Sequence, residues 1–163
     1  MSHMDEPQVR WLNADEQAVW LELIAAVMWL PAALDAQLQR DAGLSHFEYV
    51  VLMHLSMSPD REIRMSELAR RANSTLPRLS KVIDRFAKQG WATRRPDPTD
   101  GRYTLAALTD AGWDKIVESA PGHVEQVRRL VFDPLTAAQV RQLGAIAGKI
   151  AGAVRSEMTR PSS

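Results

Sequence analysis

The chain has 163 residues, of which 45% are hydrophobic and 25% charged, so we expect a globular protein and exclude a disordered one. It has no cysteine, which excludes disulfides, cysteine-ligated zinc and sensing by thiol oxidation. The formal net charge is zero, but residues 61–103 hold 11 Lys/Arg and 5 Asp/Glu, a net of +6, against −6 for the rest. Such a positive lobe can bind a polyanion although the protein as a whole is neutral, because salt limits the reach of distant charges to about 8–10 Å.

The two ends of the chain carry little information about the fold. Residues 1–12 are interpreted as a tag remnant followed by an N-terminal tail, and residues 159–163 are expected to fray. No apolar run approaches about 18 residues, and the start lacks a charged-then-apolar signal pattern. We therefore expect a cytoplasmic protein with no membrane partner.

Residues 13–40 are predicted to form a long helix. Asn13 and Glu16 have the spacing of a capping box, and apolar residues recur after them at steps of mostly three and four. Pro31 is expected to kink or interrupt this helix, and Asp41-Ala42-Gly43 to end it.

A second capping box, Ser45 with Glu48, opens a helix that is predicted to reach about Met57. The apolar face of this helix consists of Phe47, Val50, Val51 and Leu55. His54 falls in the middle of that face, which favours a buried, hydrogen-bonded histidine over a ligand-binding one.

A helix-turn-helix is predicted next. Residues 62–65 are compatible with a short strand, and residues 66–72 with a short helix that ends at Asn73. Ser74 or Thr75 then caps a helix over residues 76–88. About three residues separate the two helices, which is typical of a helix-turn-helix connection.

Helix 76–88 carries two stripes at helical spacing, roughly 160° apart. The apolar stripe, expected to face the core, is Leu76, Leu79, Ile83 and Phe86, and the basic stripe is Arg78, Lys81, Arg85 and Lys88. Residues 91–95 and 103–108 are compatible with strands, and the turn between them is rich in Pro, Asp and Gly. A basic helix followed by a basic hairpin is typical of a winged helix that binds DNA. A merely solvated basic face is the alternative for the helix alone.

Two helices are expected at the C-terminal end. Thr109 caps one that runs toward Phe132, which Pro121-Gly122 is expected to bend or break. Thr136 with Gln139 is a further capping box and opens a last helix that reaches about residue 158.

Several short runs follow one another in order between residues 65 and 112. They are Met65-Ser66-Glu67-Leu68-Ala69, Leu79-Ser80-Lys81-Val82-Ile83-Asp84-Arg85, Gly90-Trp91, Arg94, Asp97-Pro98, Asp100-Gly101-Arg102 and Leu108-Thr109-Asp110-Ala111-Gly112. As a set they resemble the multiple antibiotic resistance regulator (MarR) family, whose layout the helical arms fit from residue 13 to residue 158. Gly101 departs from the pattern, because many members carry a second basic residue there, and this puts one wing-tip phosphate contact in doubt.

The resemblance implies a mostly α-helical homodimer. Residues 45–108 would form a winged helix-turn-helix DNA-binding lobe with a two-stranded β wing, and residues 13–44 and 109–158 would form the dimerisation body. It also implies a transcriptional regulator, most often a repressor, that binds a pseudo-palindromic operator in double-stranded DNA. In many members a small aromatic or anionic effector binds between body and lobe and releases the DNA.

Helix 76–88 is expected to enter the major groove with its N-terminal end nearest the base edges. The candidate contacts on this helix and its cap are Ser74, Thr75, Pro77, Arg78, Ser80, Lys81 and Arg85. Arg78 can pair bidentately with guanine, and Pro77 can touch a thymine methyl. Arg85 is expected on a phosphate, and Ser74 or Thr75 also serves as the N-cap.

The wing supplies the second set of DNA contacts. Arg102 follows the apex of the turn, where the resemblance places the family's minor-groove arginine, and a narrow A·T-rich groove attracts such a cation. Asp100 is expected to pair with Arg102 or Arg94 and to hold the wing in shape. Arg94 and Arg95 are further DNA-contact candidates, and Ser66, near a helix N-terminus, is expected to help bind a phosphate.

Candidate effector-binding residues are chosen by their place near the expected junction of arms and lobe. They are Trp20, Trp29, His46, Tyr49, Met53 and Trp113. Aromatic and Met side chains at helical spacing are more often core than ligand site, so the core interpretation stays open. The histidine spacings match no local metal motif, and we predict no metal and no cofactor.

An enzyme and a protein–protein adaptor are the alternatives to a DNA-binding regulator. An enzyme is disfavoured, because the sequence has no Gly-rich phosphate loop, no His-Glu-x-x-His, no nucleophile elbow and no cysteine nucleophile, and we predict no catalytic residue. A winged-helix protein–protein adaptor is the better alternative, since one fold hosts unrelated functions. An adaptor would not need cations on the exposed face of the second helix.

Overall fold

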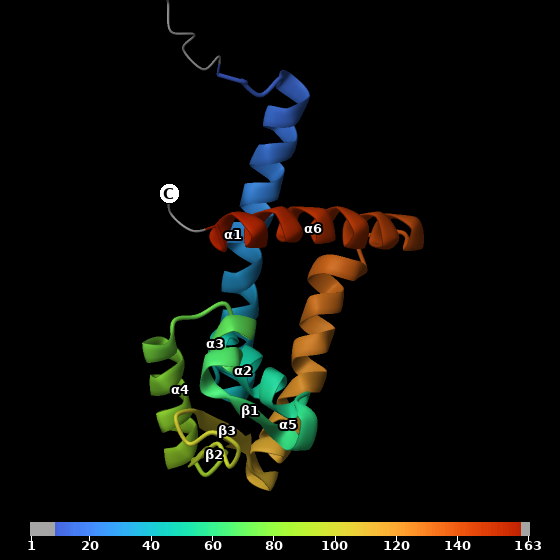
Figure 1. The fold of residues 1–163 in the computed structure, drawn as a ribbon. Helices are drawn as coiled ribbons and strands as arrows, with labels where there is room; N and C mark the ends of the chain where they lie inside the picture. The colour runs from blue at the N-terminus through green and yellow to red at the C-terminus, as the bar shows by residue number, and fades with distance from the viewer. Residues whose placement is uncertain (1–8, 161–163) are drawn as a thin grey trace, which may run out of the picture.

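The computed structural model describes residues 9–160, so the predicted tag remnant and most of the predicted frayed tail lie outside the described residues. The elements are α1 Ala14–Ala42, α2 His46–Ser56, the 3-10 turn η1 Pro59–Arg61, β1 Glu62–Arg64, α3 Met65–Arg71, α4 Leu76–Lys88, β2 Ala92–Pro96, β3 Thr104–Leu108, α5 Asp110–Val127, the π-helical turn η2 Arg128–Phe132 and α6 Ala137–Met158. In Figure 1, α2, α3, α4 and the sheet form a lobe, α1 and α5 rise from it side by side, and α6 crosses α1, whose N-terminal part extends above it. This is the predicted mostly α-helical winged-helix architecture.

The predicted helix starts are confirmed at all three capping boxes. Asn13 Oδ1 accepts from the Glu16 backbone N–H at 2.9 Å and Glu16 Oε2 accepts from the Asn13 N–H at 2.9 Å, and the boxes that open α2 and α6 have the same pattern. Pro31 is predicted to kink or interrupt α1, and the interruption does not occur, because α1 runs unbroken to Ala42 and ends at Gly43 in the left-handed region (φ 64°). A proline removes one backbone hydrogen bond, and the other turns of this long helix keep theirs.

The lobe is built around one apolar core. Its fully buried side chains come from α1, α2, α3, α4 and the segment between α1 and α2, and the largest of them are Phe86, Leu38, Leu44, Leu52, Leu55, Leu68, Leu79, Ile83 and Val51. His54 lies at the edge of this core and is hydrogen-bonded to the Arg71 backbone. It is half-buried, which is less than predicted.

The sheet has one strand more than the predicted two-stranded wing. Its order is β1-β3-β2, with both pairs antiparallel. The wing is the β2–β3 hairpin, in which Ala92 pairs with Leu108 and Pro96 with Thr104. On its other edge, β3 pairs with β1, where Ile63 lies opposite Ala106. The short strand before α3 thus ties the base of the wing to the helix-turn-helix.

Pro121-Gly122 is predicted to bend or break α5, and the break does not occur, because α5 continues through both residues to Val127. Gly122 lies against α1, and a Cβ there would come within 3.3 Å of Gln37 Nε2, so a glycine permits close packing of α5 on α1. The irregularity appears further on, as the π-helical turn that leads into α6.

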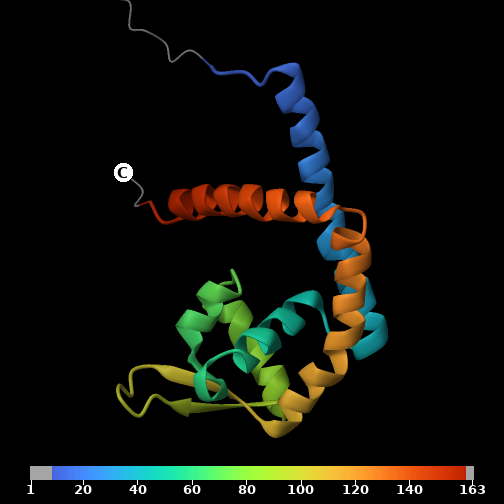
Figure 2. The same cartoon turned by 90° about the vertical axis from the view of Figure 1, so that its right-hand side faces the viewer.

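The N-terminal part of α1 and most of α6 expose apolar side chains. Trp29 on α1 is 75% exposed, Ile146 on α6 is 55% exposed, and no residue of α6 is buried. Figure 2 shows α6 running away from its junction with α5, over the lobe. Among the described residues, α1 is the one helix whose length and mean hydropathy would suffice to cross a membrane. Only 6% of its most apolar 18-residue window is buried.

Candidate nucleic-acid interface

The start of α4 is fixed by the turn that precedes it. Asn73 has a positive φ of 48°, which redirects the chain after α3. Thr75 is the N-cap, and its side chain accepts from the Arg78 N–H at 3.4 Å. Ser74 instead donates its hydroxyl to the Thr75 carbonyl at 3.2 Å, so of the two predicted caps Thr75 serves as the cap. Pro77 follows in the first turn, where its missing N–H costs no hydrogen bond.

The apolar stripe of α4 is confirmed at three of its four positions. Leu79, Ile83 and Phe86 are fully buried, but Leu76 is 48% exposed, so its assignment to the core is wrong. Leu76 is the first residue of the helix, and a helical side chain tilts toward the N-terminus. It therefore extends past the end of α4, away from the layer in which the next three stripe residues pack.

Two residues of the basic stripe, Arg78 and Arg85, contact α2 or the segment that precedes it. The Arg78 guanidinium lies over the Phe47 ring, 4.0 Å from its centroid. Arg85 donates through Nη1 to Glu48 Oε1 and through Nη2 to the Gly43 carbonyl at 3.3 Å. Both arginines are exposed to solvent and are held in place from α2.

Lys81 and Lys88 form the outermost part of the same surface. Both are exposed, and neither has an ion pair with any residue that the structure describes. At about 100° per residue, these lysines lie opposite the direction of Leu79 and Ile83. These two lysines therefore leave their charges free to meet a ligand of α4.

Glu48 joins two features that the sequence shows separately. It is buried, with 5% of its surface exposed, and its Oε2 accepts from the Ser45 N–H at 2.8 Å to complete the capping box of α2. Its other oxygen accepts from Arg85 of α4, a residue 37 positions away. The carboxylate thus caps one helix and anchors the next.

Arg102 projects from the tip of the wing. Its side chain is 84% exposed and pairs with Asp100, with Nη2 2.7 Å from Oδ2 and Nε 2.9 Å from Oδ1. These bonds lower the pKa of the Asp100 carboxyl. The predicted pairing of Asp100 is confirmed with Arg102, and it holds that guanidinium in a defined direction.

The loop of the wing, which follows β2, is closed by contacts that the sequence analysis missed. Asp97 is buried, its Oδ1 accepts from the Thr99 N–H and hydroxyl at 2.8 and 2.7 Å, and its Oδ2 accepts from Arg64 Nε of β1 at 2.6 Å. These bonds, led by those from Thr99, hold the pKa of Asp97 far below its usual range. Arg64 also lies over the Tyr103 ring, 4.4 Å from its centroid. The Asp97-Pro98-Thr99 run is the local signal, but its partner on β1 appears only in the fold.

The other wing arginines are held within the chain. Arg94 donates to the Ser80 carbonyl at 2.6 Å and to its hydroxyl at 3.0 Å, and pairs with Asp84 at 2.9 Å, which joins β2 to α4. Arg95 pairs with Glu62 of β1.

Ser66 is exposed in the first turn of α3, whose N-cap is Arg64. Glu67, in the same turn, accepts from Arg70 and Arg71, and these bonds lower the pKa of its carboxyl to about 2. The negative charge of Glu67 therefore stays close to Ser66.

Two of the candidate effector residues meet where α1, α2 and α5 join. Tyr49 is buried, and its ring centroid lies 4.2 Å from that of His123 of α5, which is 5.9 Å from the ring of His46. Burial lowers the pKa of both histidines and raises that of Tyr49. His123 Nδ1 and Gln37 Oε1 are buried there without a hydrogen-bond partner among the described residues. The sequence analysis did not single out His123.

The remaining effector candidates are spread over the molecule. Met53 is half-buried and packs against the lobe core. Trp20 and Trp29 are exposed on α1, on the part that leaves the lobe. Trp113 lies under the Arg61 guanidinium, 4.2 Å from it, and about 15 Å along α5 from His123 at the helical rise.

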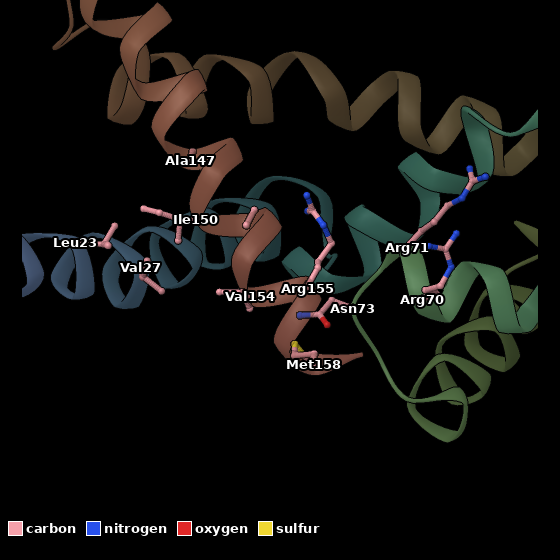
Figure 3. Close-up of a pocket in the computed structure, with 11 residues that line it drawn as sticks. Leu23, Val27, Arg70, Arg71, Asn73, Ala147, Ile150, Val154, Arg155 and Met158 are labelled. Atoms are coloured by element: carbon pink, nitrogen blue, oxygen red, sulfur yellow. The ribbon is translucent and has the colours of Figure 1, made fainter. Parts of the chain in front are cut away.

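A groove of about 490 Å³ lies between the end of α6 and the α3–α4 turn (Figure 3). One wall is apolar and comes from α1 and α6, including Leu23, Val27, Ile150 and Val154. The rim carries the side chains of Arg70, Arg71 and Arg155. Its apolar wall is continuous with the exposed faces of the arms.

Comparison with known proteins gives a consistent result. A family model described as the MarR family matches residues 42–102. The structure of Sco3205, a MarR family transcriptional regulator from Streptomyces coelicolor in complex with DNA, is 45% identical, covers 93% of this chain and 96% of that one, and has a TM-score of 0.85. AbsC, another MarR family regulator from Streptomyces coelicolor, is 32% identical over 91% of this chain and 99% of its own, also with a TM-score of 0.85.

The curated relatives match over a shorter segment. YetL of Bacillus subtilis (strain 168), an HTH-type transcriptional repressor, is 31% identical over 85 residues, which are 52% of this chain and 51% of its own. IacR of Pseudomonas putida, also an HTH-type transcriptional repressor, is 29% identical over 87 residues. The chain thus spans about half the length of the curated relatives it matches.

Proposed function

Because the chain belongs to the MarR family of transcriptional regulators, we propose that it is a homodimeric, sequence-specific DNA-binding repressor that acts on a pseudo-palindromic operator. The observation that carries this proposal is that α4 exposes Arg78, Lys81 and Lys88, while Arg94 joins to this helix a wing that exposes Arg102. We expect the protein to act in the cytoplasm, where its DNA is accessible.

The geometry supports separate contacts of α4 and of the wing with DNA. The N-terminal end of α4 would enter the major groove, where Pro77, Arg78 and Lys81 are exposed and within reach of base edges. Arg102 would enter the adjacent minor groove, already oriented by Asp100. The complex of Sco3205 with DNA supports binding of double-stranded DNA by this fold.

Part of the predicted contact set has in-chain partners. Arg85, Arg94 and Arg95 pair with carboxylates of the chain, so we assign them to holding α4 and the wing in position. Each keeps between 32% and 50% of its side chain exposed and can add a phosphate contact through its remaining N–H groups. Ser66 stays a candidate phosphate contact, because the charge of Glu67 beside it is offset by its pairs with Arg70 and Arg71.

The arms favour a dimer. The apolar side chains of α1 and α6 are exposed in one chain, and the groove of Figure 3 continues the same surface. Apolar patches of this extent mark interaction sites. A second copy would cover them by two-fold symmetry and place the two lobes on successive turns of the operator. Light scattering in aqueous buffer is expected to give twice the chain mass, and a protein that requires detergent would contradict this assignment.

We further propose that a small aromatic or anionic effector releases the DNA. The junction of His46, Tyr49 and His123 supports this, since it lies between the arms and the lobe and holds two buried polar atoms without partners. The names of YetL and IacR support repression.

The test is selection of bound duplexes from a random DNA pool at two salt concentrations. A two-fold symmetric motif with half-sites about one helical turn apart, and binding that weakens steeply with salt, is the expected result. No enriched motif and binding that ignores salt would overturn the proposal in favour of a protein-interaction module.

A further inference from the structure

We propose that Leu76 reads the 5-methyl group of a thymine in each half-site, an inference that rests on the proposed function. Leu76 is the first residue of α4 and is 48% exposed, although the residues that follow it in the apolar stripe are fully buried. An exposed leucine at the end of the helix that enters the major groove contributes little to the core of its own lobe. It is placed to contact something apolar outside the lobe.

The direction of the side chain supports a contact with bases. Side chains of a helix tilt toward its N-terminus, and no earlier turn of α4 covers Leu76, so it projects beyond the end that points into the groove. Exposed Pro77 extends the same apolar tip. Lys81, five residues after Leu76 on the cation-bearing face of α4, supplies charge that draws this end of the helix toward the phosphates.

The chemistry of the major groove leaves one apolar group for this tip. Base edges in the groove present hydrogen-bond donors and acceptors, and the 5-methyl of thymine is the apolar feature among them. Leu76 has no polar side-chain atom, so it discriminates by burying that methyl. Arg78, on the opposite flank of α4 over Phe47, is the residue placed to make the hydrogen bonds.

The test uses the selected operator with single thymines replaced by deoxyuridine, which lacks only the methyl. The wild-type full-length protein is expected to bind about fourfold more weakly at one thymine position per half-site, the factor for one buried methyl-sized group. Leu76→Ala is expected to bind both operators equally, and Leu76→Met to restore part of the ratio.

A matched variant separates this inference from general DNA binding. Lys81→Gln is expected to weaken binding to both operators while it keeps the thymine-to-deoxyuridine ratio, because it removes a charge and no apolar contact. A wild type that binds the operator but shows no ratio at any thymine, or a Leu76→Ala variant that keeps the ratio, overturns the assignment of Leu76 alone. A wild type with no operator binding overturns the proposed function and this inference with it.

Discussion

Replacing Glu48 tests whether one buried carboxylate both caps α2 and anchors the recognition helix α4. Glu48→Ala removes the bond from the Ser45 N–H and the pair with Arg85. The capping bond contributes about 0.5–1 kcal/mol. Breaking a fully buried pair costs about 3–5 kcal/mol, but half of the Arg85 side chain is exposed and can rehydrate, so we take about 1–2 kcal/mol for this pair.

The chain supplies a matched control for this prediction. Glu16 makes the same capping bond to Asn13 on α1, at 2.9 Å, but is exposed and has no arginine partner. Glu48→Ala is expected to lower the free energy of unfolding by about 1.5–3 kcal/mol, or Tm by about 3–12 °C for a domain of this size. Glu16→Ala is expected to cost at most about 1 kcal/mol.

A conservative variant then separates the two roles. Glu48→Gln keeps an acceptor for the capping box and loses only the charge, so its loss is expected to lie between those of the two alanine variants. The assay is thermal unfolding followed by circular dichroism at one fixed protein concentration, because the Tm of a dimer depends on concentration. The reasoning is refuted if Glu48→Ala costs no more than Glu16→Ala.

Three further predictions concern DNA and pH. Arg78→Ala is expected to weaken operator binding by about 1–3 kcal/mol and to relax preference at one base pair in a repeated selection, and unchanged affinity and preference would remove Arg78 from the base-reading set. Arg102→Ala is expected to weaken binding most on operators with A·T-rich flanks, and an equal loss on G·C-rich flanks would count against minor-groove contact. Burial lowers the pKa of His46 and His123 from 6.5, so the unfolded chain binds more protons and stability is expected to fall as pH drops from 6.5 toward the lowered folded values. The free energy of unfolding, measured between about pH 5 and pH 8, tests this. Replacing both His46 and His123 is expected to remove only part of the pH dependence, because the pKa of His54 is lowered as well.

The sequence predicts well those features that depend on neighbours along the chain. The three capping boxes mark the starts of α1, α2 and α6, because both partners of each box lie three residues apart. The bounds of α4 are also as predicted, since a cap, a first-turn proline and a periodic apolar stripe agree there. Neither Pro31 nor Pro121 breaks its helix, and local sequence does not decide this, because the effect of a proline depends on how much helix surrounds it.

Side-chain roles at the candidate interface could be predicted only in part. The exposed basic face and the pairing of Asp100 with Arg102 follow from local spacing. The contacts of Arg85 with Glu48, of Arg94 with Ser80 and of Arg64 with Asp97 join residues 37, 14 and 33 positions apart. Each needs two packed elements to bring its partners together, and periodicity within one element carries no information about such a pair. The stripe likewise gives no sign that Leu76, at its end, stays 48% exposed.

These long-range contacts hold α4 from two sides. On one side, Arg78 and Arg85 bind it to the start of α2, and on the other, Arg94 of the wing binds its middle. The start of α2 is in turn bound to α1, because Asp35 Oδ1 accepts from the His46 N–H at 2.8 Å. A continuous set of polar contacts therefore runs from the arm helix through the α2 cap to the recognition helix. Since α1 extends into the arms and α4 carries the cations, a shift of the arms relative to the lobe has a direct physical route to the surface that would bind DNA.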